Sequence, residues 1–253
     1  MRHFPDPPRP EAVLHGTDWA SAETPCGTGA SLPAALARLV DPDPLVRKAA
    51  LGDSLGRVTH QNSIYGATPP VALYVAAILD HPALAVHDSP VGGGPSPTPA
   101  DHPTLVSLLD WLGDTARDAD DACAAIAEDA EEGPDEPMRA FRELRPVLFS
   151  AVHPFLGHAD ADVRDLAFLA AVPLAEHPDL AAYHGALAAH ARRLLTTGTD
   201  RRHRDRALRA LRAWGHDTAD LENASDVEAR ERYARYRAER ASVSGGYSAE
   251  PPF

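Results

Sequence analysis

The stretch PDPLVRKAAL, residues 42–51, constrains the fold of this chain most because it combines a helix start with a helix-packing pattern. Asp43 can cap a helix with its side chain, and Pro44 suits the first helical position because it has no N–H to leave unpaired. The predicted buried stripe of the helix that follows consists of Val46, Ala50, Leu51 and Leu55. Arg47 is one step off this stripe, where we expect it at the helix edge, within reach of an acidic group in an adjacent turn.

The same order of residues returns twice, in LGHADADVRDLAFLAAVPL and, less well matched, in TGTDRRHRDRALRALRAW. The first two copies are 117 residues apart, which is three times 39, and the last two are 40 apart. A period near 39 residues is typical of a two-helix solenoid repeat, and degenerate copies are expected near 85 and 124. The motif residues are Asp43, Val46, Arg47 and Ala50, then Asp160, Val163, Arg164 and Ala167, then Asp200, Arg204 and Ala207. The pattern predicts an all-α chain, folded as a right-handed α-solenoid of about five helical hairpins.

These residues resemble HEAT repeats, whose pattern is a helix with an early proline, a D-x-x-V-R-x-x-A turn and helix, and a variable link. Pro33 precedes the first copy in the corresponding place, and Pro146 precedes the second. The segment 58–79, VTHQNSIYGATPPVALYVAAIL, is similar to a segment that joins successive repeats in uncharacterised bacterial HEAT-repeat proteins. The resemblance covers residues 10–215 and implies an armadillo-like α-solenoid with a capping helix at its end.

We expect one solenoid domain over residues 10–241, between a flexible lead at 1–9 and a disordered tail at 242–253. Two loop insertions are predicted, at 88–103, where Gly, Pro and Ser dominate, and at 130–137, which is acidic. The hydrophobic fraction of 44% is mostly Ala, Leu and Val, and only 6% of residues are aromatic. This composition favours closely packed helices over extended sheet.

A net charge of −13 makes the chain a poor candidate for binding nucleic acid or an anionic membrane, and a fair one for a basic protein. The charge is uneven, because residues 192–240 carry 13 Arg against 9 Asp and Glu, whereas 1–191 are strongly acidic. No apolar leader and no run of 18 apolar residues occurs in the sequence, which predicts a cytoplasmic protein. Cys26 and Cys123 are far apart and form no CxxC motif, which argues against a disulfide framework.

The sequence contains none of the common catalytic or metal-binding motifs. Its 13 histidines form no HExxH motif, and the repeated His-Glu dipeptides of deoxyhypusine hydroxylase, a solenoid metalloenzyme that resembles this fold, do not occur. Glu176-His177 has the reverse order and is expected to end a helix. No GxSxG, P-loop or GxGxxG motif is present. We therefore predict no metal, no cofactor and no catalytic residue.

Two polar clusters supply the candidate partner-binding residues. The stretch HQNSIYGATPP places His60, Gln61, Asn62 and Tyr65 in a link between repeats, where solenoids often carry ligand contacts. The structural alternative is that His60 and Asn62 cap the helix that ends there, with Tyr65 packed beneath. The second cluster is in the acidic stretch 118–137, whose first part is expected to continue the leucine-rich helix before it. Its candidate residues are Asp118, Asp120 and Asp121.

The sequence predicts a protein-binding or scaffold module, and more specifically an immunity or antitoxin protein whose acidic surface masks a basic partner such as a nuclease. The alternative is a HEAT-like alkylpurine DNA glycosylase, a class that resembles this architecture and holds DNA in a basic groove with Trp and Asp near the damaged base. Asp110 and Trp111 would take those places. The basic groove would be an arginine-rich face near Trp214 that comprises Arg192, Arg193, Arg201, Arg202, Arg204, Arg209 and Arg212. Otherwise these arginines are expected to pair with Asp200 and Asp205 on solvated helix faces, while the tryptophans fill the core.

Overall fold

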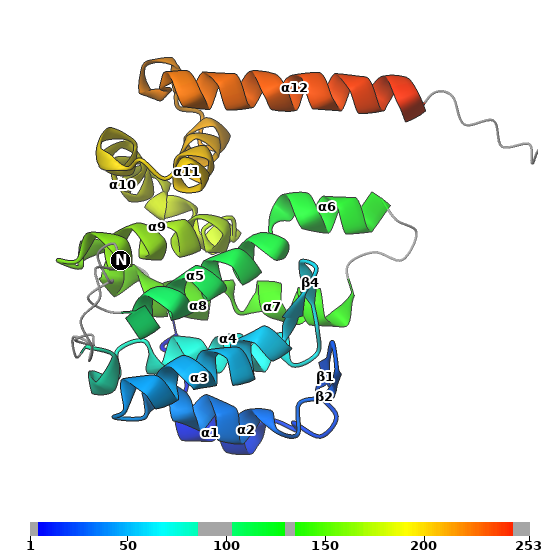
Figure 1. The fold of residues 1–253 in the computed structure, drawn as a ribbon, viewed down its shortest axis with the longest axis vertical. Helices are drawn as coiled ribbons and strands as arrows, with labels where there is room; N and C mark the ends of the chain where they lie inside the picture. The colour runs from blue at the N-terminus through cyan, green and yellow to red at the C-terminus, as the bar shows by residue number, and fades with distance from the viewer. Residues whose placement is uncertain (1–4, 86–102, 130–134, 245–253) are drawn as a thin grey trace, which may run out of the picture. The chain divides into compact units, whose positions relative to one another are not determined.

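A computed structural model of the chain describes residues 5–85, 103–129 and 135–244 (Figure 1). This part of the chain is mostly helical, which confirms the all-α prediction, and its only strands form two hairpins with two residues in each strand. None of the described helices is both long and apolar enough to cross a membrane. The chain divides into two compact units, residues 1–190 and 191–253.

The first unit begins with α1 (Pro10–Gly16), the hairpin of β1 (Glu23–Thr24) and β2 (Gly27–Thr28), α2 (Leu32–Ala37) and α3 (Pro44–Ser54). Next come the hairpin of β3 (Thr59–His60) and β4 (Ser63–Ile64), α4 (Thr68–Ile78), α5 (Pro103–Asp118), α6 (Asp121–Asp129), α7 (Glu136–Glu143), α8 (Arg145–Val152) and α9 (Ala161–Leu174). α10 (His184–Thr197) crosses the boundary, and the second unit continues with α11 (Arg201–Ala213) and α12 (Ala224–Ser244). Short 3₁₀ segments are Arg38–Val40, Leu55–Arg57, Pro82–Leu84, His153–Gly157, Pro178–Tyr183 and Ala219–Leu221.

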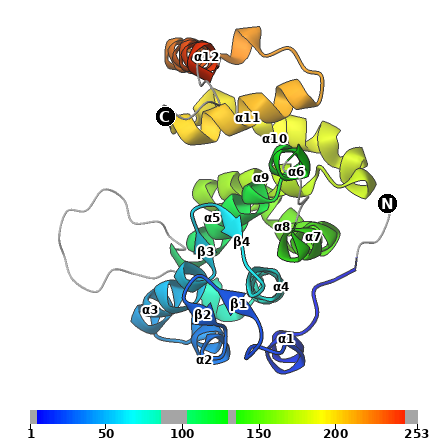
Figure 2. The same ribbon diagram turned by 90° about the vertical axis from the view of Figure 1, so that its right-hand side faces the viewer.

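The centre of the first unit is the contact of α5 with α9, the most extensive helix pair in the described residues. Leu108, Leu109 and Leu112 of α5 are fully buried there. Gly113 allows the two backbones to approach closely, since a Cβ at this position would come within 3.1 Å of Ala170 Cα on α9. Figures 1 and 2 both show α5 between α9 on one side and α3 and α4 on the other. The polar face of α5 is therefore fixed in place by a buried apolar face.

Helix starts recur along the chain at the spacing seen in the sequence. Asp43, Asp160 and Asp200 are the N-caps of α3, α9 and α11, and each carboxylate accepts a hydrogen bond from a first-turn N–H at 2.8–3.0 Å. At the start of α6, the Asp120 carboxylate accepts a hydrogen bond of 2.8 Å from the N–H three residues later. His81 Nδ1 accepts a similar hydrogen bond from a backbone N–H at the start of a 3₁₀ turn. These five caps are separated by 38, 39, 40 and 40 residues.

The arginine of the motif satisfies backbone carbonyls that precede the N-cap. Arg47 is only 2% exposed, and its Nη1 donates to the carbonyls of the two residues before Asp43 at 2.7 and 3.2 Å. Arg164 donates in the same way to the two carbonyls before Asp160, at 2.8 and 3.1 Å. Because carbonyls at such ends have no helical partner, the arginine supplies the missing donor. The predicted place of Arg47 at the helix edge is therefore wrong.

Two further helix predictions are corrected by the described residues. Val46 and Leu51 are half-buried rather than buried, because α3 turns Arg47 and Ala50 inward instead. The leucine-rich helix does not continue into the acidic stretch, since α5 ends at Asp118 and α6 starts afresh at the Asp120 cap.

Parts of the predicted loops and tails are outside the described residues, namely 1–4, 88–102, 130–134 and 245–253. Inside the described residues, Pro103 already belongs to α5, and Asp135 caps α7 through the N–H of Met138 at 2.9 Å. The predicted C-terminal helix is α12, which extends to Ser244.

Candidate functional site

The polar link at residues 59–64 folds as a β-hairpin in which β3 pairs antiparallel with β4. Gln61 and Asn62 form its two-residue turn with φ angles of 50° and 61°. Two left-handed residues are what this kind of tight hairpin turn needs, but a residue with a Cβ, and Gln more than Asn, is strained there. The alternative in which His60 and Asn62 cap a helix is therefore wrong.

The hairpin is anchored at its base by Thr68, the first residue of α4. The buried Thr68 hydroxyl donates to the Val58 carbonyl at 2.8 Å and accepts the N–H of Tyr65 at 3.0 Å. Ile64 of β4 is 5% exposed, and β4 packs on α5. Figure 2 shows β3 and β4 beside α5. The strained turn is thus held at a fixed place next to the polar face of α5.

That face of α5 carries a row of carboxylates. Asp110, Asp114 and Asp118 are four residues apart, so successive members are about 6 Å apart along the helix axis. All three are half-buried, and the carboxylate of Asp118 is 3.5 Å from the guanidinium of Arg117. The row adjoins Trp111, which is half-buried on the same helix.

The hairpin and α5 together enclose a groove of about 380 Å³. Its lining residues are Thr59, His60, Gln61 and Asn62 of the hairpin and Ser107, Asp110, Trp111, Asp114, Thr115 and Asp118 of α5. The lining contains three carboxylates and neither Lys nor Arg. We call this site the hairpin groove.

Two polar atoms of the groove lining have no hydrogen-bond partner within the described residues, the indole N–H of Trp111 and the hydroxyl of Thr115. Thr115 is 1% exposed, and its hydroxyl does not make the bond to the carbonyl four residues back that helical Thr often makes. A buried donor without an acceptor costs about 1–3 kcal/mol. Both atoms are shielded from solvent, so a ligand recovers that free energy only when a neighbouring group moves aside and lets its acceptor reach them.

The groove therefore favours a ligand with two kinds of group. Positively charged groups would meet the carboxylate row, and such charge-assisted hydrogen bonds are stronger than neutral ones. A carbonyl or another acceptor would satisfy the Trp111 indole, whose N–H can only donate. A cation over the Trp111 ring would gain a further attraction from the ring face. A basic peptide carries all of these groups, whereas a simple polyamine has no acceptor.

Four of the seven predicted binding residues line the hairpin groove, namely His60, Gln61, Asn62 and Asp118. The other three, Tyr65, Asp120 and Asp121, are outside its lining. Sequence reasoning missed Asp114 and Thr115 of α5 altogether. A spacing of four residues between the aspartates was the signal that would have found the carboxylate row.

Asp121 belongs instead to a cluster that fixes the corner between α5 and α6. Its Oδ1 is 2.7 Å from Arg142 Nη2 and 3.1 Å from Arg145 Nη1. Both arginines also donate to the Ala119 carbonyl, at 2.8 and 2.7 Å. Burial raises the pKa of Asp121, but the hydrogen bonds and charges of the two arginines outweigh it and hold the pKa below its usual value. These contacts explain Asp121 as a structural residue.

Glu176 completes this cluster from the end of α9. Its Oε2 accepts the N–H of Asp121 at 2.7 Å and is 3.7 Å from Arg145 Nη2. The pKa of Glu176 is raised to about 7, chiefly by burial and also by the carboxylates of Asp121 and Asp120, although the hydrogen bond from the Asp121 N–H and the charge of Arg145 lower it. Glu176 therefore titrates near neutral pH, at a corner whose first residue, Asp118, also lines the hairpin groove.

Cys123 is a weak nucleophile. Burial and the neighbouring Asp120 raise the pKa of Cys123 to about 11, so its nucleophilic thiolate is scarce at neutral pH. Cys26 is exposed. Within the described ranges, no group of three or more His, Cys, Asp or Glu side chains is placed to hold a metal ion.

The arginine-rich face and the Asp110-Trp111 pair belong to different compact units. Arg204 is 5% exposed and pairs with Asp226 at 2.6 Å, and Arg209 pairs with Asp205 at 3.0 Å. These two arginines of the face are therefore engaged with acidic groups of the chain itself.

Comparison of the chain with protein-family models, curated proteins and solved structures finds no match. The HEAT-repeat resemblance thus rests on the residues and the helix starts described above.

Proposed function

We propose that the chain is a non-enzymatic protein-binding module that holds a basic segment of a partner protein in the hairpin groove. The observation that carries this proposal is the coincidence of three carboxylates with two buried polar atoms, on Trp111 and Thr115, that have no partner in the described residues. A strained turn at the rim adds support, because backbone strain is often kept where a residue has a binding role.

The spacing of the carboxylate row favours an extended basic peptide. Alternate side chains of an extended strand are about 6.6–6.8 Å apart on one face, close to the 6 Å or so between aspartates four apart on a helix. Basic residues at every second position would then meet Asp110, Asp114 and Asp118 in turn. Peptide carbonyls between them would supply the acceptors for Trp111.

We extend the proposal to the fold class and the biological role. Four helix starts and one 3₁₀ turn, spaced 38–40 residues apart, favour a HEAT-like right-handed solenoid of about five hairpins. Residues 1–190 contain 27 Asp and Glu against 11 Arg and Lys, which suits a protein that masks a basic partner. An immunity or antitoxin protein acting on a basic nuclease in the cytoplasm is the form of this role that we favour.

Calorimetric titration of the full chain with an acetylated and amidated octapeptide of alternating Arg and Ala tests the groove. Replacing Asp114 with Asn removes one charge of the row and is expected to weaken binding about tenfold, which is 1.4 kcal/mol. The matched control is Asp162→Asn on α9, an exposed carboxylate outside the groove lining. It removes the same charge and should change the affinity less than about twofold, a surface effect.

A second pair of titrations tests the acceptor. Trp111→Phe keeps an aromatic ring but loses the indole N–H, so it should weaken the binding of the peptide more than the binding of spermine, which has no acceptor and loses only part of its attraction to the ring. If Asp114→Asn and Asp162→Asn lower the affinity for the peptide equally, peptide binding depends only on the overall charge of the chain, and the proposal fails. Tighter binding of a single-stranded oligonucleotide than of the peptide would also contradict it.

A further inference from the structure

The second unit contains a larger hollow of its own, between α11 and α12. It has a volume of about 680 Å³, and its lining contains more arginines than carboxylates, namely Arg201, Arg202, Arg209, Arg212 and Arg230 against Asp200, Asp205 and Asp226, together with Tyr233. Residues 191–253 carry 13 Arg and Lys against 10 Asp and Glu, the reverse of the balance in residues 1–190. The charge change predicted from the sequence falls at the boundary between the two units. This hollow, the α11–α12 groove, thus differs in chemistry from the acidic hairpin groove.

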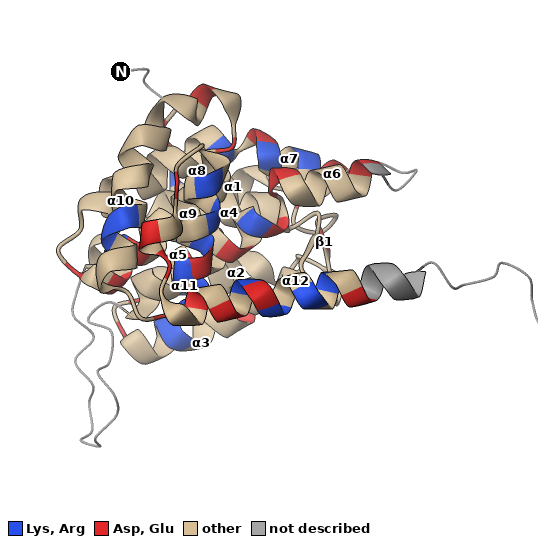
Figure 3. Cartoon of the chain, turned by 90° about the horizontal axis from the view of Figure 1, so that it is seen from above, with Lys and Arg blue, Asp and Glu red and all other residues tan. Residues whose placement is uncertain are grey.

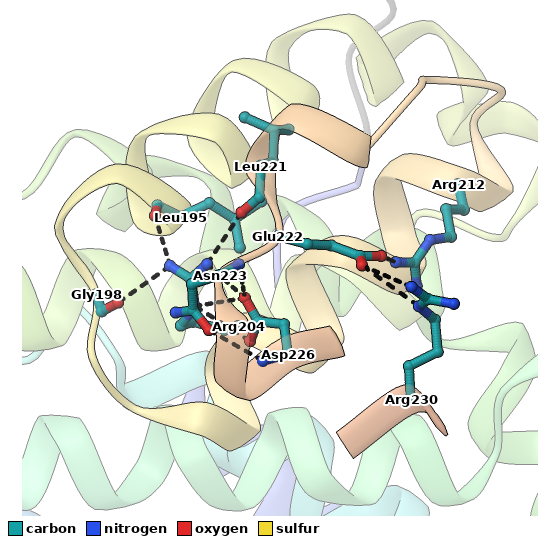
Figure 4. A network of polar contacts seen from close by, with 9 residues as sticks. All are labelled: Leu195, Gly198, Arg204, Arg212, Leu221, Glu222, Asn223, Asp226 and Arg230. Carbon is teal, nitrogen blue, oxygen red and sulfur yellow. Dashed lines mark hydrogen bonds and ion pairs between the residues drawn. The ribbon is translucent and has the colours of Figure 1, made fainter. Parts of the chain in front are cut away.

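Two arginines of this groove are held together by one carboxylate (Figure 4). The side chain of Glu222 is 9% exposed. Its Oε1 accepts a hydrogen bond from Arg212 Nη2, and its Oε2 accepts one from Arg230 Nη2 at 3.2 Å. Arg212 Nε also donates to the Thr218 hydroxyl at 3.0 Å. Within the described residues, Nη1 of neither arginine has an acceptor. One negative charge therefore orients two positive ones and leaves each with a donor group unused.

The frame under this pair is rigid because a buried ion pair joins the two helices. Arg204 and Asp226 have side chains that are 6% and 4% exposed, and their closest contact is 2.6 Å. Asn223 and Asp226 exchange N–H to side-chain hydrogen bonds of 2.9 Å at the start of α12. The relative position of Arg212 and Arg230 is thus set before any ligand arrives, which lowers the entropy cost of binding.

The two guanidiniums that share the Glu222 carboxylate suit a phosphate-bearing ligand. A phosphate monoester carries close to two negative charges at neutral pH and three acceptor oxygens, and it matches the planar donors of arginine. Tyr233 is 57% exposed and comes one helical turn after Arg230, where its ring can cover a planar or apolar part of the same ligand. The groove volume lies in the range of small-molecule sites. α12 carries acidic as well as basic residues along its length (Figure 3), so it offers no continuous track for a nucleic acid strand.

We propose that the α11–α12 groove binds a small phosphate monoester of about nucleotide size, with its phosphate at the unused Nη1 groups of Arg212 and Arg230 and its remaining part against Tyr233. This site is independent of the hairpin groove and of the basic partner proposed above. It gives the chain a second ligand of opposite charge.

The test uses the full chain and three probes, inorganic phosphate, adenosine 5′-monophosphate and adenosine, in calorimetric titrations. We expect the monophosphate to bind more tightly than phosphate, and adenosine not to bind measurably. Arg230→Gln should lower the affinity for the monophosphate at least tenfold. The matched control is Arg232→Gln, because Arg232 is on the same helix, equally exposed, paired with Glu228 and outside the groove lining. It should change the affinity less than twofold.

Arg230→Lys separates charge from geometry, since it keeps the charge and loses the planar donors. Tyr233→Ala should reduce the monophosphate affinity toward that of inorganic phosphate and leave phosphate itself unchanged. Equal effects of Arg230→Gln and Arg232→Gln, or no binding of either phosphate probe at millimolar concentration, would overturn the proposal. Preferred binding of an oligonucleotide without a terminal phosphate would overturn it as well.

Discussion

Replacing Asp226 with Asn should unfold the second unit locally, because it leaves the guanidinium of Arg204 buried without its counter-ion. Arg204 is 6% exposed at its side chain and donates to both carboxylate oxygens of Asp226, at 2.6–3.3 Å. It also donates to the carbonyls of Leu195, Gly198 and Leu221, so it cannot swing into solvent without breaking these bonds. Removing one partner of a buried ion pair costs about 3–5 kcal/mol. A unit of this size has little stability beyond that amount.

The matched control is Asp205→Asn on α11, because Asp205 pairs with Arg209 at 3.0 Å while both side chains are more than half exposed. Exposed pairs of this kind contribute about 0–1 kcal/mol, so the control should unfold almost as the parent chain does. Hydrogen–deuterium exchange of peptides from α11 and α12, measured in increasing urea, gives the free energy of opening for this unit.

A double replacement, Arg204→Met with Asp226→Leu, should restore most of the loss, since a buried pair can be exchanged for apolar side chains at little cost. The Asp226 carboxylate should also make the stability of the second unit fall at acidic pH. Burial raises the pKa of Asp226, but Arg204 and the Asn223 N–H lower it more, so the net pKa is below its usual value. The stability that this group adds is present above the unfolded-state pKa and is lost as the pH falls through the folded-state pKa. If Asp226→Asn loses no more stability than Asp205→Asn, the reasoning is refuted.

Three further predictions concern the first unit. Gly113→Ala should destabilise it by about 1–3 kcal/mol in urea unfolding, because the new Cβ would be 3.1–3.2 Å from backbone atoms of Ala170, which cannot move alone; a loss below about 0.5 kcal/mol would contradict the close approach of α5 and α9. The raised pKa of Glu176, about 7 against 4.5, means that the folded chain holds this proton more tightly, so the gain in stability is complete below pH 4.5 and is lost as the pH rises through 7. Glu176→Gln should therefore flatten the stability–pH curve and be more stable than the parent above pH 7 by about 1–2 kcal/mol, after allowance for partial exposure; an unchanged slope between pH 5 and 7 would count against it. Gln61→Gly should stabilise the chain by about 0.5–1 kcal/mol, since it removes a left-handed non-glycine residue, and a destabilisation would show that the turn is not strained.

The helix starts could be predicted from the sequence because their chemistry is local. An aspartate that caps its own first turn needs only residues two or three positions away, so Asp43, Asp160 and Asp200 were identified from their neighbours alone. The mostly helical character of the chain followed from the same local rules.

Residues whose partners are distant in the sequence could not be predicted in this way. The buried place of Arg47 depends on the turn before it and on Thr104, to whose hydroxyl it donates at 3.3 Å across 57 positions of the chain. The hairpin groove joins a turn at Gln61 and Asn62 to a helix about 50 residues later, and no local pattern records that contact. The separation of charge was visible in the sequence, but its coincidence with two compact units was not.

The most direct test of the central claim is a hydrogen–deuterium exchange footprint of the full chain with the alternating Arg-Ala octapeptide. We expect slower exchange in two segments that are distant in the sequence, residues 58–66 and 107–119, and unchanged exchange in α11 and α12. Protection in only one of the two segments, or protection confined to residues 191–253, would contradict a groove formed by the hairpin and α5.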